Sequence, residues 1–182
     1  MKQRDIENIQ RILMNESPWN YGVMDDDFEE HMSNFSVEKV QQMKFVTEWN
    51  TMNVYYQTEF EYGEYYILKN NELVAFYRFD PKSNYIQTEI TWNKRGNKGV
   101  LRKFLAEYII PKYGMVESGN KLSTNAFSMW ENMYVEYPQY DYLVKYKNGE
   151  TKTITHHTQF VLYSSSSFND DLAFTTFIVK EK

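Results

Sequence analysis

The sequence contains no cysteine, and its 182 residues include only seven glycines and four prolines. Without cysteine, the chain has neither a disulfide framework nor a metal site built on thiolates. No apolar run approaches the ~20 residues that a membrane-spanning helix needs, so we expect no membrane partner. The start of the chain lacks the apolar segment of a secretion signal, which predicts a cytoplasmic location, the host cytoplasm if the source is a virus.

Charge and composition narrow the class of protein further. The net charge of −5 makes nucleic acid an unlikely partner for the surface as a whole. Hydrophobic residues make up 42% of the chain, and 16 Tyr and 12 Phe raise the aromatic share to 18%, which excludes disorder and favours β-structure. We expect a helical extension at residues 1–35, followed by one domain at residues 36–182.

The spacing of apolar residues predicts both helices and strands. Helical spacing occurs at residues 5–15, 37–49, 100–110 and 124–136, and Ser36 is the expected N-cap of the second helix. Alternation predicts strands at residues 64–69, 73–79, 85–92, 115–118, 140–146, 151–155, 159–163 and 173–179. Asn70-Asn71 and Asn148-Gly149 are expected to form tight turns, and residues 64–92 to form a three-stranded meander.

A basic, glycine-containing loop, residues 93–99, connects the strand at 85–92 to the helix at 100–110. Free backbone N–H groups and the start of a helix together favour a bound phosphate, although an ordinary turn has the same composition. The loop belongs to a cluster of cations: Lys94, Arg95, Lys98, Arg102 and Lys103. This cluster is either a phosphate site, a nucleic-acid contact with Trp92 as a stacking neighbour, or a solvated surface.

Two segments resemble motifs of the GNAT acetyltransferase family. Residues 93–101 are similar to the family's pyrophosphate loop, Q/R-x-x-G-x-G/A, and residues 116–131 resemble its later strand and helix. The order of expected elements across residues 35–180 is also that of the family. The combination is similar to small acetyltransferase-like proteins that bacteriophages often carry.

The resemblance implies an α+β fold whose central sheet is mixed, mostly antiparallel and flanked by helices. It also implies transfer of an acetyl group from acetyl-CoA to an amine by direct attack. Glu89 is then the candidate general base and Tyr134 the candidate acid for the leaving thiolate. Residues expected to contact the cofactor are Thr91, Trp92, Lys94, Arg95, Gly96, Asn97, Lys98, Gly99 and Asn125. Without the resemblance, Glu89 is an exposed strand residue and Tyr134 an aromatic at the edge of the core.

Departures from the loop motif favour an alternative function. Asn93 stands where the family has Gln or Arg, and Lys98 stands where it has a second small residue. The alternative is a catalytically inactive protein that binds another protein, as a host or defence inhibitor or a virion component, with a homodimer possible. Modification of a nucleobase is a third, weaker hypothesis.

Other polar features predict no metal site. The acidic residues at 25–27 and 29–30 are expected to be a solvated helix start, and His31 a surface residue. His156 and His157, if they lie on a strand, point to opposite faces and cannot share a metal ion.

Overall fold

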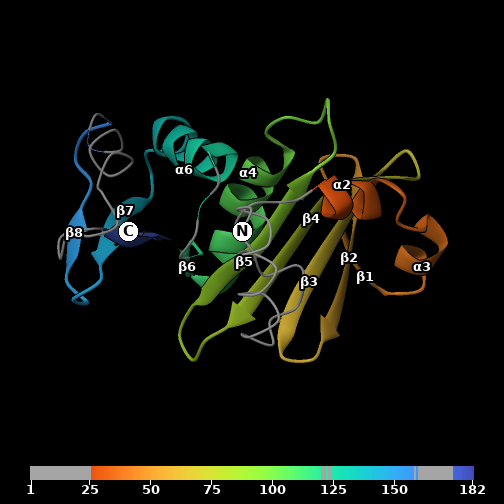
Figure 1. Ribbon diagram of the computed structural model, residues 1–182, viewed down its shortest axis with the longest axis horizontal. Helices are drawn as coiled ribbons and strands as arrows, with labels where there is room; N and C mark the ends of the chain where they lie inside the picture. The colour runs from red at the N-terminus through yellow and green to blue at the C-terminus, as the bar shows by residue number, and fades with distance from the viewer. Residues whose placement is uncertain (1–25, 120–121, 123, 158, 160–173) are drawn as a thin grey trace, which may run out of the picture.

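The computed structural model describes residues 26–182 apart from 120–121, 123, 158 and 160–173. Its strands form one sheet in the order β1-β2-β3-β4-β5-β6-β9-β7-β8. Only β5 and β6 pair in parallel, and all other neighbours are antiparallel. The expected α+β class with a mixed, mostly antiparallel sheet is therefore confirmed (Figure 1).

The strands are β1 (Lys44–Trp49), β2 (Met52–Glu59), β3 (Tyr62–Lys69), β4 (Glu72–Pro81), β5 (Ile86–Asn93), β6 (Met115–Glu117), β7 (Asp141–Tyr146), β8 (Thr151–Thr153) and β9 (Phe174–Lys180). The helical segments are α2 (Asp26–Ser33), α3 (Val37–Gln41), α4 (Val100–Phe104), the π-helical η1 (Leu105–Ile109), α5 (Ile110–Tyr113) and α6 (Thr124–Glu136). The predicted meander over β3, β4 and β5 is present, and Asn70 and Asn71 both have positive φ in its first turn.

The predicted helix at residues 37–49 is wrong over most of its length. Ser36 does cap a helix, because its Oγ accepts a hydrogen bond from the Lys39 N–H at 3.3 Å, but α3 ends at Gln41. The following residues form β1, which is rich in aromatic and β-branched side chains and pairs with β2. Asn50 and Thr51, both at positive φ, make the tight turn between these strands.

The helix after the glycine loop continues beyond Pro111, where the sequence predicted an end or a kink. It runs from Val100 to Tyr113, with π-helical geometry from Leu105 to Ile109. Proline lacks an N–H and disturbs the regular hydrogen-bond ladder, and a π-turn just before it absorbs that disturbance. Gly114, at φ +75°, then ends the segment and leads into β6.

Helices cover both faces of the sheet and create two cores. The α4–α5 segment and α6 pack on one face through residues such as Phe104 and Trp130. On the other face, α2 and α3 pack through Phe28, Met32 and Val40. In Figure 1, α2 accordingly lies in front of the strands and the α4–α5 segment behind them.

Several remaining predictions have clear outcomes. Helix 124–136 is confirmed as α6, and the Asn148-Gly149 turn joins β7 to β8. His156 and His157 lie in a bend and turn after β8, not on a strand. The predicted helix at 5–15 falls outside the described residues, as does most of the predicted strand at 159–163. Within the described part of the chain, no helix is both long and apolar enough to cross a bilayer.

Gly63 on β3 provides a test of this packing, because a Cβ there would lie 2.2 Å from Cζ of the buried Phe79. We expect Gly63→Ala to lower the free energy of unfolding by about 1–3 kcal/mol through overpacking. Chemical denaturation of Gly63→Ala, Phe79→Leu and the double variant measures the coupling between the two positions. Equal costs of Gly63→Ala in both backgrounds would contradict the described contact.

Candidate functional site

The outer edge of β5, defined as the side facing β6 from Glu89 to Trp92, is the first component of the candidate site. β5 pairs with β6 only at Ile86↔Val116 and Gln87↔Glu117, and no described strand pairs with this side of β5 further along. The chain after β6 still approaches β5 closely, since a Cβ on Gly119 would lie 3.0 Å from the Thr88 carbonyl oxygen. Backbone polar groups on the outer edge are therefore candidates for pairing with an extended ligand.

A β-bulge at Glu89 changes which face each half of β5 presents. Phe79 pairs with Thr88 and Arg78 with Ile90, so Glu89 is the extra residue. Ile86 is buried in the core under α4, whereas Ile90 is buried in the core under α2. A bulge leaves one residue without a place in the ladder and redirects its side chain, and such irregularities are enriched beside active sites.

The hydroxyl of Tyr77 lies next to this bulge and is locked in place. It is 3.1 Å from Thr88 Oγ1, and Tyr77 has no exposed surface. Burial raises the pKa of Tyr77, with a smaller opposing contribution from the Thr88 hydrogen bond. The Tyr77 hydroxyl therefore stays protonated near neutral pH. It lies one residue from Glu89 through its contact with Thr88, and Glu89 itself is half-buried.

The glycine loop after β5 is open to solvent on one side and anchored on the other. Gly96 and Gly99 have φ of +91° and +82°, and no protein atom lies within 4 Å of a Cβ built on Gly96. The Lys94 N–H donates to the Val74 carbonyl at 2.9 Å, which fixes the loop to β4. Left-handed glycines followed by a helix start are typical of backbone loops that bind anions.

Asn93, which replaces the family's usual Gln or Arg, has a local structural role. Its Oδ1 accepts a hydrogen bond at 3.1 Å from the backbone N–H of Leu101, in the first turn of α4. The side chain thus caps the helix from eight residues earlier in the chain. The Asn93 side chain therefore accepts from a backbone N–H, that of Leu101, that would otherwise be available to a phosphate.

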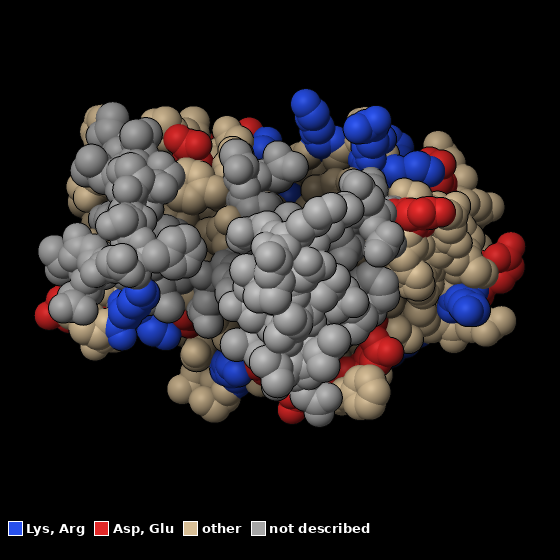
Figure 2. Space-filling model, viewed as in Figure 1, with Lys and Arg blue, Asp and Glu red and all other residues tan. Residues whose placement is uncertain are grey.

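Carboxylates pair with three of the five predicted cations. Arg102 contacts Glu136 through two hydrogen bonds of 2.9 and 2.6 Å, and Lys103 lies 3.8 Å from Glu107. Lys94 forms an ion pair with a carboxylate of β4, that of Glu72. Figure 2 shows basic side chains at the upper edge, where the β5–α4 loop lies in Figure 1, with acidic ones beside them.

The other two cations, Arg95 and Lys98, are exposed, and no ion pair joins either to a described residue. Their positions flank Gly96 and Asn97, and Asn97 donates its N–H to the Lys94 carbonyl at 3.0 Å. Arg95 and Lys98 are therefore the charges best able to neutralise a bound anion.

Two predicted contact residues on β5 face different cores. The ring of Trp92 is 1% exposed and belongs to the core under α2, so the alternative in which it stacks on a nucleic-acid base is wrong. Thr91 is half-buried opposite Tyr77 on the other face. Asn125 lies in the first turn of α6, and its side chain is outside the described part of the structure.

Tyr134, the predicted acid, lies on α6 above β7. Its ring meets Tyr142 edge-on, with 5.1 Å between ring centroids and 75° between planes. β7 is separated from β5 by β6 and β9. Sheet order therefore places the contact partner of Tyr134 well along the sheet from Glu89.

A buried carboxylate that the sequence reasoning did not single out lies on β6. Glu117 is 4% exposed and accepts hydrogen bonds from Thr176 Oγ1 at 2.5 Å and Lys145 Nζ at 3.1 Å. These partners join β6 to β9 and β7, so Glu117 holds this half of the sheet together. The only available signal was a glutamate inside an apolar strand.

Histidines and acids do not form a metal centre within the described residues, where no group of three or more potential ligands converges. His157 Nε2 instead lies 3.0 Å from Glu131 Oε1 of α6.

Comparison with solved structures finds acetyltransferases at low similarity. An acetyltransferase from Bacillus subtilis in complex with CoA is 13% identical with a TM-score of 0.37, over 67% of this chain and 78% of that chain. A probable acetyltransferase from Staphylococcus epidermidis is 10% identical with a TM-score of 0.40, over 100% and 96%. No protein-family model and no curated protein matches the chain. Because these similarities are weak, the function is inferred from the contacts within this chain.

The capping role of Asn93 is testable by substitution. Asn93→Ala removes the acceptor for the Leu101 N–H, and we expect a loss of about 1 kcal/mol in the free energy of unfolding. Asn93→Asp keeps an acceptor oxygen and should retain the wild-type stability. Urea denaturation of both variants gives the comparison, and equal losses in the two would exclude the cap.

Proposed function

We propose that this protein binds acyl-CoA along the outer edge of β5 and transfers the acyl group to an amine. The observation that carries the proposal is the conjunction at β5 of an edge without a described partner strand, a bulge at Glu89 and an open glycine loop. An extended pantetheine-like chain needs backbone partners along its length and an anion site at one end. The outer edge of β5 provides the backbone partners, and the glycine loop that follows it in the chain provides the anion site.

The residues of the loop fit the diphosphate of such a ligand. Space around Gly96 is open, so phosphate oxygens have access to the main chain. Arg95 and Lys98 supply exposed positive charge, whereas Arg102 is engaged by Glu136. The exposed side chain of Lys98 replaces the family's small residue and contributes a charge in return.

The chemistry would require a base at the bulge. When bound, acetyl-CoA supplies an activated thioester carbon. The Glu89 carboxylate accepts a proton from the attacking amine, directly or through water, as the C–N bond forms and the C–S bond breaks. The departing thiolate takes its proton from water or, where the bound thioester extends along the sheet toward β7, from Tyr134.

Measuring CoA binding tests the proposed phosphate site in the glycine loop. Native mass spectrometry of the purified protein mixed with CoA should show one CoA per chain, and titration calorimetry should give a dissociation constant. We expect Arg95→Ala and Lys98→Ala each to weaken binding about twofold to fivefold, the range for exposed ion pairs.

Lys152→Ala is the matched control, since Lys152 lies on β8 at the far end of the sheet and its Nζ lies over the Tyr146 ring. It should leave CoA affinity unchanged. Absence of bound CoA at millimolar concentration would contradict the proposal. The protein-binding alternative would then be preferred, with recovery of one stoichiometric partner as its own requirement.

Catalysis by Glu89 is a separate prediction. With acetyl-CoA and a panel of primary amines, including spermidine and a lysine peptide, thiol release should fall at least ~100-fold in Glu89→Gln. CoA affinity should change little, because the proposed edge uses the backbone of Glu89, which Glu89→Gln retains, and the side chain is not part of the phosphate loop. Tyr134→Phe should lower kcat without affecting CoA binding if its hydroxyl protonates the thiolate. An unchanged rate in Tyr134→Phe would remove the acid role alone, whereas an unchanged rate in Glu89→Gln would remove the base.

A further inference from the structure

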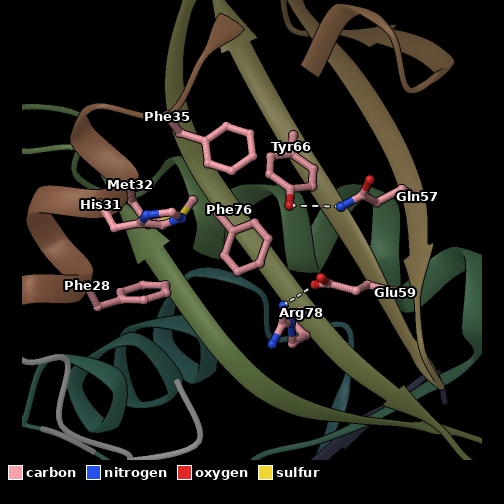
Figure 3. Close-up of a pocket in the computed structure, with 9 residues that line it drawn as sticks. All are labelled: Phe28, His31, Met32, Phe35, Gln57, Glu59, Tyr66, Phe76 and Arg78. Atoms are coloured by element: carbon pink, nitrogen blue, oxygen red, sulfur yellow. Dashed lines mark hydrogen bonds and ion pairs between the residues drawn. The ribbon is translucent and has the colours of Figure 1, made fainter. Parts of the chain in front are cut away.

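A cavity of about 170 Å³ lies between α2 and the sheet, on the face opposite α4. Side chains of α2 and the following turn form one wall, and β2, β3 and β4 form the other (Figure 3). A cavity of roughly 150 Å³ is large enough to hold a benzene molecule, so this one accommodates a small organic group. The proposed acyl-transfer chemistry does not use it.

Aromatic rings form a continuous lining. Centroid distances are 6.4 Å from Phe28 to Phe76, 4.9 Å from Phe76 to Tyr66 and 5.3 Å from Tyr66 to Phe35. The faces of such rings carry negative electrostatic potential and attract cations. The protein already uses this property, because the Arg78 guanidinium lies 5.9 Å from the Phe76 ring centroid.

Three polar side chains of the lining, those of Gln57, Tyr66 and Arg78, come from three strands and contact one carboxylate behind the lining, that of Glu64. Glu64 has no exposed surface, and it accepts hydrogen bonds from Gln57 Nε2 at 2.6 Å, Tyr66 OH at 2.8 Å and Arg78 Nε at 2.6 Å. With these three donors, the buried carboxylate is satisfied within the protein. It is therefore fully engaged by the protein and does not line the cavity itself.

Glu59 provides a second carboxylate that remains accessible. It lies 2.7 Å from Arg78 Nη2, yet its side chain is 49% exposed. The Arg78 guanidinium thus contacts two carboxylates, Glu59 in the lining and Glu64 behind it, so this cluster holds one more carboxylate than guanidinium, and His31 completes the polar lining. Partial burial and, next, the Glu64 carboxylate raise the pKa of Glu59, whereas the Arg78 guanidinium acts to lower it.

From the rings and the charge together, we propose that this cavity binds a small organic cation such as a quaternary or primary ammonium group. The apolar substituents of the cation contact Phe28, Phe35 and Phe76, and Glu59 compensates its charge. An anion of the same size is disfavoured by both carboxylates, and a neutral group gains no electrostatic attraction from the rings. This site is independent of CoA binding at β5.

Three probes of nearly the same shape distinguish binding of a cation, a neutral group and an anion. Choline carries a trimethylammonium group, 3,3-dimethyl-1-butanol replaces its nitrogen by carbon, and 3,3-dimethylbutyrate supplies an anion of similar shape. Saturation-transfer NMR and titration with the full chain should show choline binding about tenfold more tightly than the neutral alcohol, with no detectable binding of the anion. Equal affinities for all three, or preference for the anion, would overturn the proposal.

Charge-removing variants locate the site. Glu59→Gln should weaken choline binding about fivefold and leave affinity for the neutral alcohol unchanged. Glu61→Gln is the matched control, because Glu61 is exposed two residues away and does not line the cavity. Phe35→Leu keeps an apolar side chain but removes a ring, and it should also reduce the preference for choline. If the Glu59 and Glu61 variants weaken choline binding equally, the cavity is not the site, and thermal melting verifies that each variant is folded.

Discussion

The bulge at Glu89 determines how β5 serves two cores at once. Strict alternation would keep every second residue of this strand on one face, but Ile86 packs under α4 while Ile90 packs under α2. Because β5 is central in the sheet, both helical layers depend on this single extra residue. The proposed base lies at the point where the strand changes face, so the architecture and the proposed chemistry share one irregularity.

The two candidate sites use the sheet differently. At β5, an edge without a described partner strand and an exposed loop present the main chain, and the proposed ligand there is extended and anionic. β2, β3 and β4 pair with one another, and the cation site proposed there depends on their side chains. The acidic character of the second site and the basic loop of the first favour ligands of opposite sign.

Much of the fold could be predicted from residues that are close together in the sequence. Paired asparagines at Asn70-Asn71 and the Asn148-Gly149 turn predicted their hairpins, because these residues tolerate positive φ. The segment forming β1 was misread because Val40, Met43 and Val46 fall near helical spacing, while the turn at Asn50 and Thr51 has no glycine to signal it. A short strand and a helix share too many apolar patterns to be separated without their neighbours.

The geometry of the candidate sites was harder to predict from the sequence than the fold. Counting outward from the Asn70-Asn71 turn places Glu64 opposite Tyr77, but an irregularity between Ile67 and Leu68 moves it opposite Arg78. The buried ion pair follows from that shift, as the face change follows from the bulge at Glu89. Neither irregularity is marked by a glycine or proline, so the pairing of charges depends on packing between distant segments.

The position of β9 has a consequence for how the chain acquires its structure. It follows every other described strand in the chain, yet it lies between β6 and β7 and pairs with both. Neighbours in the chain are enough to build β1 through β5, whereas among the described strands it is β9 that pairs the β7–β8 hairpin with the rest of the sheet. During translation the two halves of the sheet therefore stay separate until β9 has emerged from the ribosome, and a nascent chain stalled before that point exposes the unpaired edges of β6 and β7 to chaperones and to other chains.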